Sequence, residues 1–109
     1  MKPALVLVCV VATALIAAPV FGAGNAAAGK EVFAKKCSSC HGNAGEGKEA
    51  VAKMLKVEIK DLGSKDVQAK SDADVKKTIM EGTGKMKAVA GVDAKAADDV
   101  VAFVRTLKK

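Results

Sequence analysis

The 109-residue chain has no tryptophan, no tyrosine and only three phenylalanines. Proteins that bind single-stranded nucleic acid stack the bases on aromatic side chains interleaved with basic ones. This chain has neither that pattern nor a recognised nucleic-acid-binding motif, so we expect no nucleic-acid partner. A small domain with so few large side chains buries little apolar surface, and such a domain usually needs a staple such as a bound cofactor.

Strand patterning is also missing, because no segment alternates apolar and polar residues with the period of two that a half-buried strand has. Helical spacing is present instead, and it predicts an all-α domain of about four short helices. The expected helices are residues 24–36, residues 49–55, one opened by a capping arrangement at Ser71 and ended by Gly82 and Gly84, and a last one capped by Asp93. Residues 57–63 are expected to be irregular.

Gly29 lies inside the first expected helix, where a glycine costs stability relative to alanine. A close helix crossing at this position, where no side chain fits, would account for the glycine. Fraying near a new N-terminus is the alternative.

Residues 1–24 have the features of a cleaved secretory signal peptide. Lys2 gives a positive start, an apolar run follows from Ala4 to Phe21, and small residues after it offer peptidase sites. An uncleaved membrane anchor is the alternative, although this run of 18 residues is at the short end for spanning a bilayer. Cleavage would remove Cys9 and leave residues 25–109 as one exported domain, periplasmic in a bacterium, with no stable membrane insertion.

Cys37, Cys40 and His41 form the sequence C-x-x-C-H, which is the attachment motif of a c-type haem. Two thiols on one turn can each add to a vinyl group on the same edge of a porphyrin, which gives two thioether bonds. The imidazole of His41 then lies over the ring and can take one axial position on the iron. We therefore expect one covalently attached haem c, which would also be the staple of the small core.

Three other interpretations of this motif are open. A thioredoxin-like redox pair needs a strand–helix context, which the sequence does not show. A closed structural zinc site needs four ligands, and the exported chain offers only Cys37, Cys40 and His41. A plain disulfide between the two cysteines is permitted in an exported protein.

The second axial ligand could be Met54, Met80 or Met86, because a methionine thioether can bind haem iron opposite a histidine. Met54 and Met80 lie in expected helices, where we expect them to pack in the core. Met86 lies in an expected loop between two lysines, after Gly82 and Gly84, and glycines let the backbone approach a ligand closely. We therefore predict that Met86 is the second ligand.

Together these residues resemble the class I c-type cytochromes, and above all the small single-haem bacterial electron carriers. The resemblance covers essentially all of residues 25–109. It is carried by Cys37-x-x-Cys40-His41-Gly42, by Gly-x-Gly-x-Met ending at Met86, and by a terminal helix with Phe103 and Leu107. The resemblance implies a cytochrome c-like fold around a covalently bound haem, with axial ligation by histidine and methionine. It also implies that the first and last helices cross near Gly29, Phe33 and Phe103.

Three features depart from the usual pattern of that family. Lys87 stands where proline usually follows the methionine, and Phe103 stands where tyrosine or tryptophan is usual. The loop after His41 contains no proline, although many family members have one there.

Basic residues outnumber acidic ones by 17 to 12 once Lys2 is set aside. Lys35, Lys36, Lys85 and Lys87 flank the expected ligand segments, so they could surround an exposed haem edge. Such a basic rim would steer the protein toward an acidic docking face on a larger redox protein. The alternative is that these lysines only increase solubility.

The resemblance therefore implies a soluble, monomeric electron carrier rather than an enzyme, because both axial positions on the iron would be filled and no substrate would bind the metal. The alternative is a haem-based sensor or a peroxidase-like enzyme, in which the sixth iron position is labile or open.

Overall fold

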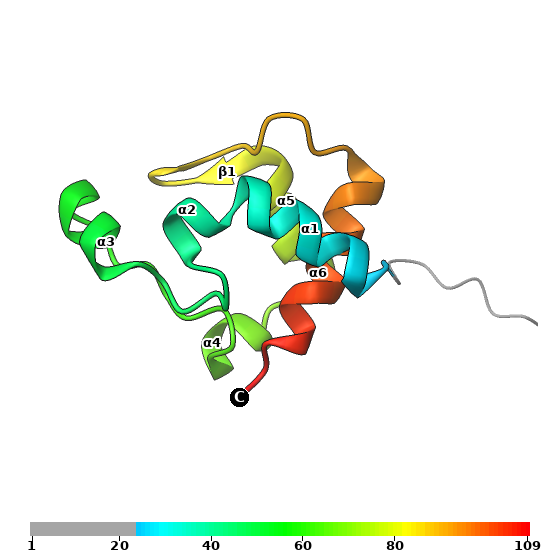
Figure 1. The fold of residues 1–109 in the computed structure, drawn as a ribbon, viewed down its shortest axis with the longest axis horizontal. Coiled ribbons are helices and arrows are strands. Elements are labelled where there is room, and N and C mark those ends of the chain that lie inside the picture. Colours follow the sequence, from blue (N-terminus) through cyan, green and yellow to red (C-terminus); the bar gives the residue numbers. More distant parts are fainter. Residues whose placement is uncertain (1–23) are drawn as a thin grey trace, which may run out of the picture.

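The computed structural model describes residues 24–109, and Figure 1 shows their arrangement. The expected signal peptide, apart from Gly24, lies outside the described residues, as does Cys9. The elements are α1 (Ala26–Lys36), α2 (Ser38–His41), α3 (Glu49–Leu55), α4 (Lys65–Gln68), α5 (Asp72–Glu81), β1 (Gly82–Thr83), β2 (Met86–Lys87) and α6 (Ala94–Thr106). The expected all-α fold class is confirmed. The short helices α2 and α4 were not expected.

The expectation that there would be no strand was wrong at one place. Strands β1 and β2 pair antiparallel, with Gly82 opposite Lys87 and Thr83 opposite Met86. Gly84 is the first residue of the two-residue loop between them, and its φ of 54° suits a tight hairpin turn in which glycine is preferred at that position. Two residues per strand are too few to leave an alternating pattern in the sequence.

Side-chain caps fix the start of three helices. Asn25 accepts a hydrogen bond from the backbone N–H of Ala28, so α1 begins two residues later than expected. The caps expected at Ser71 and Asp93 are both confirmed, since their side chains accept hydrogen bonds from backbone N–H groups at 3.1 Å and 2.8 Å, three residues further on. Helix α3 has the bounds that the sequence predicts.

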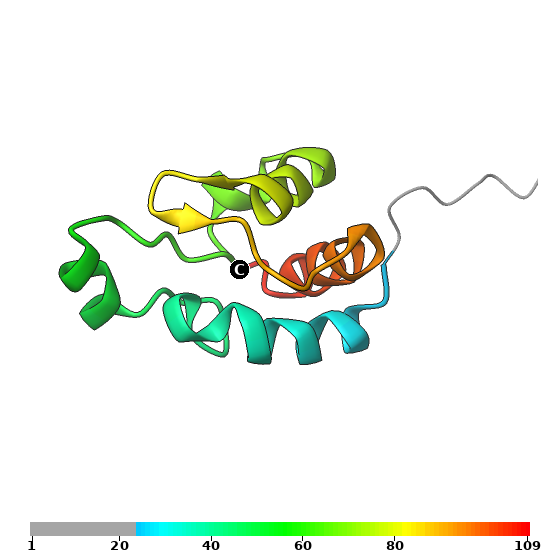
Figure 2. The same cartoon turned by 90° about the horizontal axis from the view of Figure 1, so that it is seen from above.

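Helix α6 lies between α1 and α5, as the view in Figure 2 shows. The crossing of α1 and α6 is as close as Gly29 predicts, because a Cβ atom there would lie 2.9 Å from the backbone nitrogen of Val100 and closer still to the Asp99 carbonyl group. Beyond this point the rings of Phe33 and Phe103 pack with centroids 5.1 Å apart. The expected crossing of the first and last helices is therefore confirmed.

A buried carboxylate also joins these two helices. Asp99 on α6 accepts hydrogen bonds from the backbone N–H of Asn25 at 2.8 Å and from Nζ of Lys95 at 3.3 Å. The bond from Asn25, followed by the interaction with Lys95, holds the pKa of the Asp99 carboxyl below its ordinary value, against the opposing effect of desolvation. Asp99 thus anchors the start of α1 to the side of α6.

The segment between α4 and α5 is attached to α6 by Arg105 and Gln68. The Arg105 guanidinium donates to Oδ1 of Asp72 at 2.9 Å and to the backbone carbonyl of Lys70 at 2.6 Å. The Gln68 amide donates to the carbonyls of Leu62 and Val104 at 2.8 Å and 2.9 Å. These bonds hold residues 62–72 in place against the last helix.

The core positions expected for Met54 and Met80 were both wrong. Met54 is 73% exposed, because α3 buries no residue and stands away from the helices of the core in Figure 1. Met80 is 38% exposed, because on α5 it is the neighbouring Ile79 that faces the core. Within residues 24–109, no helix has both the length and the apolar character needed to cross a membrane.

Candidate functional site

A cavity of about 460 Å³ opens between the segments that follow α1 and the faces of α5 and α6. Its volume is within the range of pockets that hold small molecules and cofactors. The cavity is lined by Phe33, Cys37, Cys40, His41, Leu55, Val57, Glu58, Ile59, Lys60, Leu62, Val67, Lys70, Val75, Thr78, Ile79, Thr83, Gly84, Lys85, Met86 and Val100. All four residues expected to attach or ligate haem are in this set.

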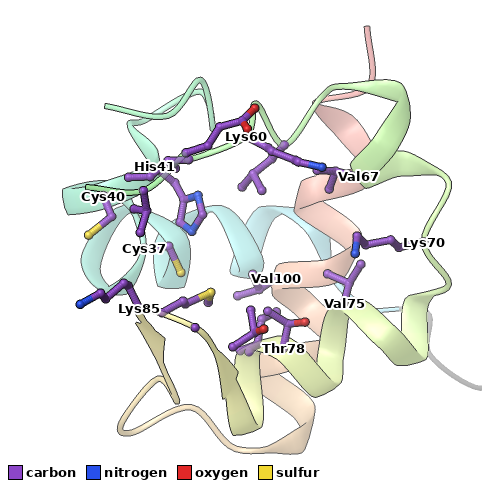
Figure 3. Close-up of a pocket in the computed structure, with 18 of the residues that line it drawn as sticks. Cys37, Cys40, His41, Lys60, Val67, Lys70, Val75, Thr78, Lys85 and Val100 are labelled. Carbon is purple, nitrogen blue, oxygen red and sulfur yellow. The ribbon is translucent and has the colours of Figure 1, made fainter. Parts of the chain in front are cut away.

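The two cysteines are placed by the end of α1 and by α2. Cys37 caps α1 through its N–H, which donates to the carbonyl of Phe33 at 2.9 Å, and α2 then carries Cys40 and His41 round a single turn. Figure 3 shows both sulfur atoms on the same side of the pocket. Both are free thiols, so the disulfide alternative is not formed here. Burial raises the pKa of the Cys37 thiol, which keeps it protonated at neutral pH.

His41 projects into the pocket in Figure 3, with Phe33 at a ring-centroid distance of 6.3 Å. Burial lowers the pKa of His41, so the imidazole is neutral at neutral pH and keeps a lone pair. Its Nδ1 atom is buried and has no hydrogen-bond partner among the described residues. The loop after it is held by its backbone, with the N–H of Gly47 donating to the His41 carbonyl at 2.7 Å.

Met86 lies on β2 and is half-buried, and it lines the cavity together with its neighbours Gly84 and Lys85. Met54 and Met80 are not among the lining residues. The hairpin therefore brings one of the three candidate methionines to the cavity that contains His41.

The remaining walls are mostly apolar and come from three parts of the chain. Val57, Ile59 and Leu62 belong to the irregular segment expected at residues 57–63, while Val75, Thr78 and Ile79 form the inner face of α5. Lys60, Val67 and Lys70 also line the cavity, and sequence reasoning did not single them out. They lie in or beside irregular segments, where no periodicity shows which side chains turn inward.

A second, smaller hollow of about 210 Å³ shares the cysteines, His41, Lys85 and Met86 with the cavity. Lys36 and Lys87 line it as well, so three of the four lysines expected around a haem edge lie beside the cysteine side of the site. Lys35 lines neither hollow.

These residues fit a covalently attached haem. Two free thiols on one turn could form the thioether bonds, and a neutral imidazole with an unpartnered ring nitrogen and a thioether sulfur line the same cavity. The predominantly apolar walls would bury the porphyrin faces.

Comparisons with known proteins indicate the kind of protein to which the chain belongs. The family model described as "Cytochrome C oxidase, cbb3-type, subunit III" matches residues 24–104. No protein in a search of curated proteins matches the chain. One solved structure that is similar to it is titled "KustC0563 c-type cytochrome"; it is 25% identical, with a TM-score of 0.63 over 74% of this chain and 98% of that one. The chain therefore belongs to the family described as cytochrome c oxidase, cbb3-type, subunit III, and is a small c-type cytochrome, a haem-containing electron carrier.

Proposed function

We propose that the protein carries single electrons between larger redox proteins through one haem c, attached at Cys37 and Cys40 and ligated by His41 and Met86. The observation that best supports this proposal is that all four side chains line one largely apolar cavity, although Met86 is far from the others in sequence. Unrelated packing would not require a methionine on a hairpin to share a cavity with the C-x-x-C-H turn.

Each of these residues would have a separate task. The bound haem supplies an iron that changes between its ferric and ferrous states. The cysteine thioethers would fix the position of the porphyrin edge, and the neutral His41 imidazole would donate its lone pair to the metal. Met86 is a soft ligand, and such ligation raises the reduction potential. With both axial positions filled, no substrate would bind the iron, so we propose a carrier and not an enzyme.

The β1–β2 ladder supports a fixed position for Met86. Lys87, which stands where the family usually has proline, is paired with Gly82 in this ladder. Backbone pairing can therefore orient the hairpin without the rigid ring of a proline. This supports the carrier over the sensor or peroxidase-like alternative, in which the sixth position would be labile.

The exposed lysines beside the cysteines support docking to an acidic partner. Lys36, Lys85 and Lys87 line the smaller hollow next to Cys37 and Cys40. A positive field at this edge would speed a short-lived encounter with an acidic face on a larger redox protein. We propose that the exported, periplasmic domain does this as a monomer after loss of its signal peptide.

Optical spectroscopy of the haem-loaded protein tests the ligand assignment. Methionine sulfur bound to ferric haem gives a weak far-red band, so we expect this band in the native protein and its loss in Met86→Ala. Met80→Ala and the strongly exposed Met54→Ala are matched controls and should keep the band. Reduced native protein should resist carbon monoxide, and reduced Met86→Ala should bind it.

Each contrary outcome has its own meaning. Loss of the band in Met80→Ala but not in Met86→Ala would move the ligand to Met80. Bound haem without the band in the native protein, together with ready binding of carbon monoxide, would favour the sensor or peroxidase-like alternative. Absence of covalent haem would return Cys37 and Cys40 to the disulfide hypothesis.

A further inference from the structure

Three lysines line the main cavity, and they lie on two different sides of it. Figure 3 shows Lys85 on the side of Cys37 and Cys40, whereas the side chains of Lys60 and Lys70 lie across the pocket from the two sulfur atoms. The proposed docking surface uses Lys85, but neither the ligand set nor that surface uses Lys60 or Lys70.

The positions of the side groups on a haem ring are relevant to the placement of Lys60 and Lys70. The two vinyl groups of the porphyrin are on one edge, and the two propionates are on the opposite edge. A ring attached through its vinyl groups to Cys37 and Cys40 would therefore direct its propionates toward the far side of the cavity. A carboxylate that enters a largely apolar cavity is strongly disfavoured unless a cation or hydrogen-bond donor meets it.

We propose that Lys60 and Lys70 bind the two haem propionates, an inference that rests on the proposed haem attachment at Cys37 and Cys40. These two lysines lie on the side of the cavity toward which the two propionates would point. Lys60 is paired with Asp66 at 3.6 Å, but both side chains are at least half exposed. Such a long, exposed pair is weak, so Lys60 can exchange Asp66 for a propionate.

Lys70 is positioned by its backbone. Its carbonyl accepts the 2.6 Å hydrogen bond from Nη2 of Arg105, and this bond holds Lys70 against α6. Arg105 itself is committed to Asp72, Gln68 and the Lys70 carbonyl. Arg105 therefore fixes the backbone of Lys70, while the ammonium group of Lys70 is the cation available to bind a ligand in the cavity.

Other charged and titratable groups face the same cavity. Glu58 adds a negative charge to those of two propionates, and Lys85 and His41 lie on the cysteine side. The negative charge of Glu58 increases the need for positive charge on the far side, which the two lysines together supply.

Zero-length cross-linking of the native haem protein tests the contact directly. A carbodiimide adds to a propionate oxygen, and a neighbouring lysine amine then attacks the activated carboxyl carbon. The amide C–N bond forms as the C–O bond breaks, and the carbodiimide leaves as a urea that carries the propionate oxygen. After digestion, we expect mass spectrometry to find the haem peptide that contains Cys37 and Cys40 joined to Lys60 or Lys70. Lys65 on α4 is the internal control, because it lies between them in sequence but does not line the cavity.

The pH dependence of the haem reduction potential provides a second readout. A propionate that titrates produces an inflection in the plot of reduction potential against pH, and loss of a nearby cation raises the propionate pKa. We therefore expect this inflection to shift up by about half a pH unit in Lys60→Gln or Lys70→Gln, a threefold change in proton affinity. In the double variant we expect a shift of about one unit, or tenfold. Lys65→Gln removes the same charge and should leave the inflection unchanged.

Cross-links only to Lys65 or Lys85, or an inflection in the double variant that matches that of Lys65→Gln, would overturn the propionate assignment. With covalent haem and the methionine band intact, that result would leave the proposed function standing. A native protein without covalent haem would overturn both.

Discussion

Replacing Gly29 by alanine tests how tightly α1 and α6 are packed. The new Cβ atom would lie 2.9 Å from the backbone nitrogen of Val100 and closer to the carbonyl of Asp99. Carbon atoms in ordinary contact are about 3.5 Å from their neighbours, so the two helices would have to separate by roughly 1.5 Å to clear the Asp99 carbonyl oxygen. The obstacle is backbone and not a flexible side chain, which places the cost at the upper end of overpacking, about 3 kcal/mol.

Alanine also favours the helical state over glycine by about 1 kcal/mol, and this gain opposes the overpacking cost. The net expectation is that Gly29→Ala lowers the free energy of unfolding by about 2 kcal/mol. For a domain of this size, that corresponds to a Tm lower by about 8–16 °C.

Thermal and urea unfolding of the haem-loaded protein, followed by far-UV circular dichroism, would measure this change. Ala34→Gly is the matched control, because Ala34 is exposed on the same helix and its replacement reports the helix-propensity effect alone, about 1 kcal/mol. If Gly29→Ala is as stable as the native protein, or more stable, the crossing is not tight and our reasoning fails.

The remaining predictions concern the two networks that join other segments to α6. The pKa of Asp99 in the folded protein is held below its ordinary value of 3.8, so the unfolded chain binds more protons in this pH range. Asp99 therefore contributes its full stabilisation above pH 3.8. This contribution is lost as the pH falls through the lower pKa of the folded state. We expect Asp99→Asn to be less stable at pH 7 and to lose less stability between pH 7 and acid pH, as measured by urea unfolding at several pH values; an unchanged pH profile would contradict this. Arg105→Gln removes the bonds to Asp72 and to the Lys70 carbonyl, so we expect a loss of about 1–3 kcal/mol in the free energy of unfolding. A change below about 0.5 kcal/mol, the usual limit for surface substitutions, would show that this network is not a structural one.

Local signals in the sequence were sufficient for the main helices and for one close contact. Ser71 and Asp93 cap their helices because the oxygen of a short side chain accepts a hydrogen bond from the backbone N–H three residues further on. Such a cap requires no distant partner. Gly29 predicts a close crossing because a glycine within a helix lowers its stability unless a side chain cannot fit there. The backbone of α6 leaves no room for one. The C-x-x-C-H turn is also local, so the sequence alone predicts its three residues as one site; the structure shows them lining one cavity, and their roles toward haem stay a prediction.

Features that depend on distant partners could not be predicted. The bond from Gln68 to Val104 and the bonds of Arg105 join residues 33 to 37 positions apart, and the sequence around one partner gives no indication of the other. Met54 has the apolar character of a core residue, but its helix stands away from the core and leaves it exposed. Lys60 and Lys70 line the cavity because of the path that the folded chain takes around it, and this path cannot be deduced from their neighbours in the sequence.

The pairing of α1 with α6 has a consequence for how the domain folds. The hydrogen bond from Asn25 to Asp99 closes a loop of 74 residues, and closing so long a loop costs about 4 kcal/mol of chain entropy before any contact compensates for it. Contacts of such high sequence separation slow folding, so we expect this pairing to form late. A group attached covalently at Cys37 and Cys40 and held at its other side by α5, α6 and the hairpin would draw these segments together first. The bare chain would then fold slowly, and attachment of the cofactor would act as the event that starts assembly of the domain.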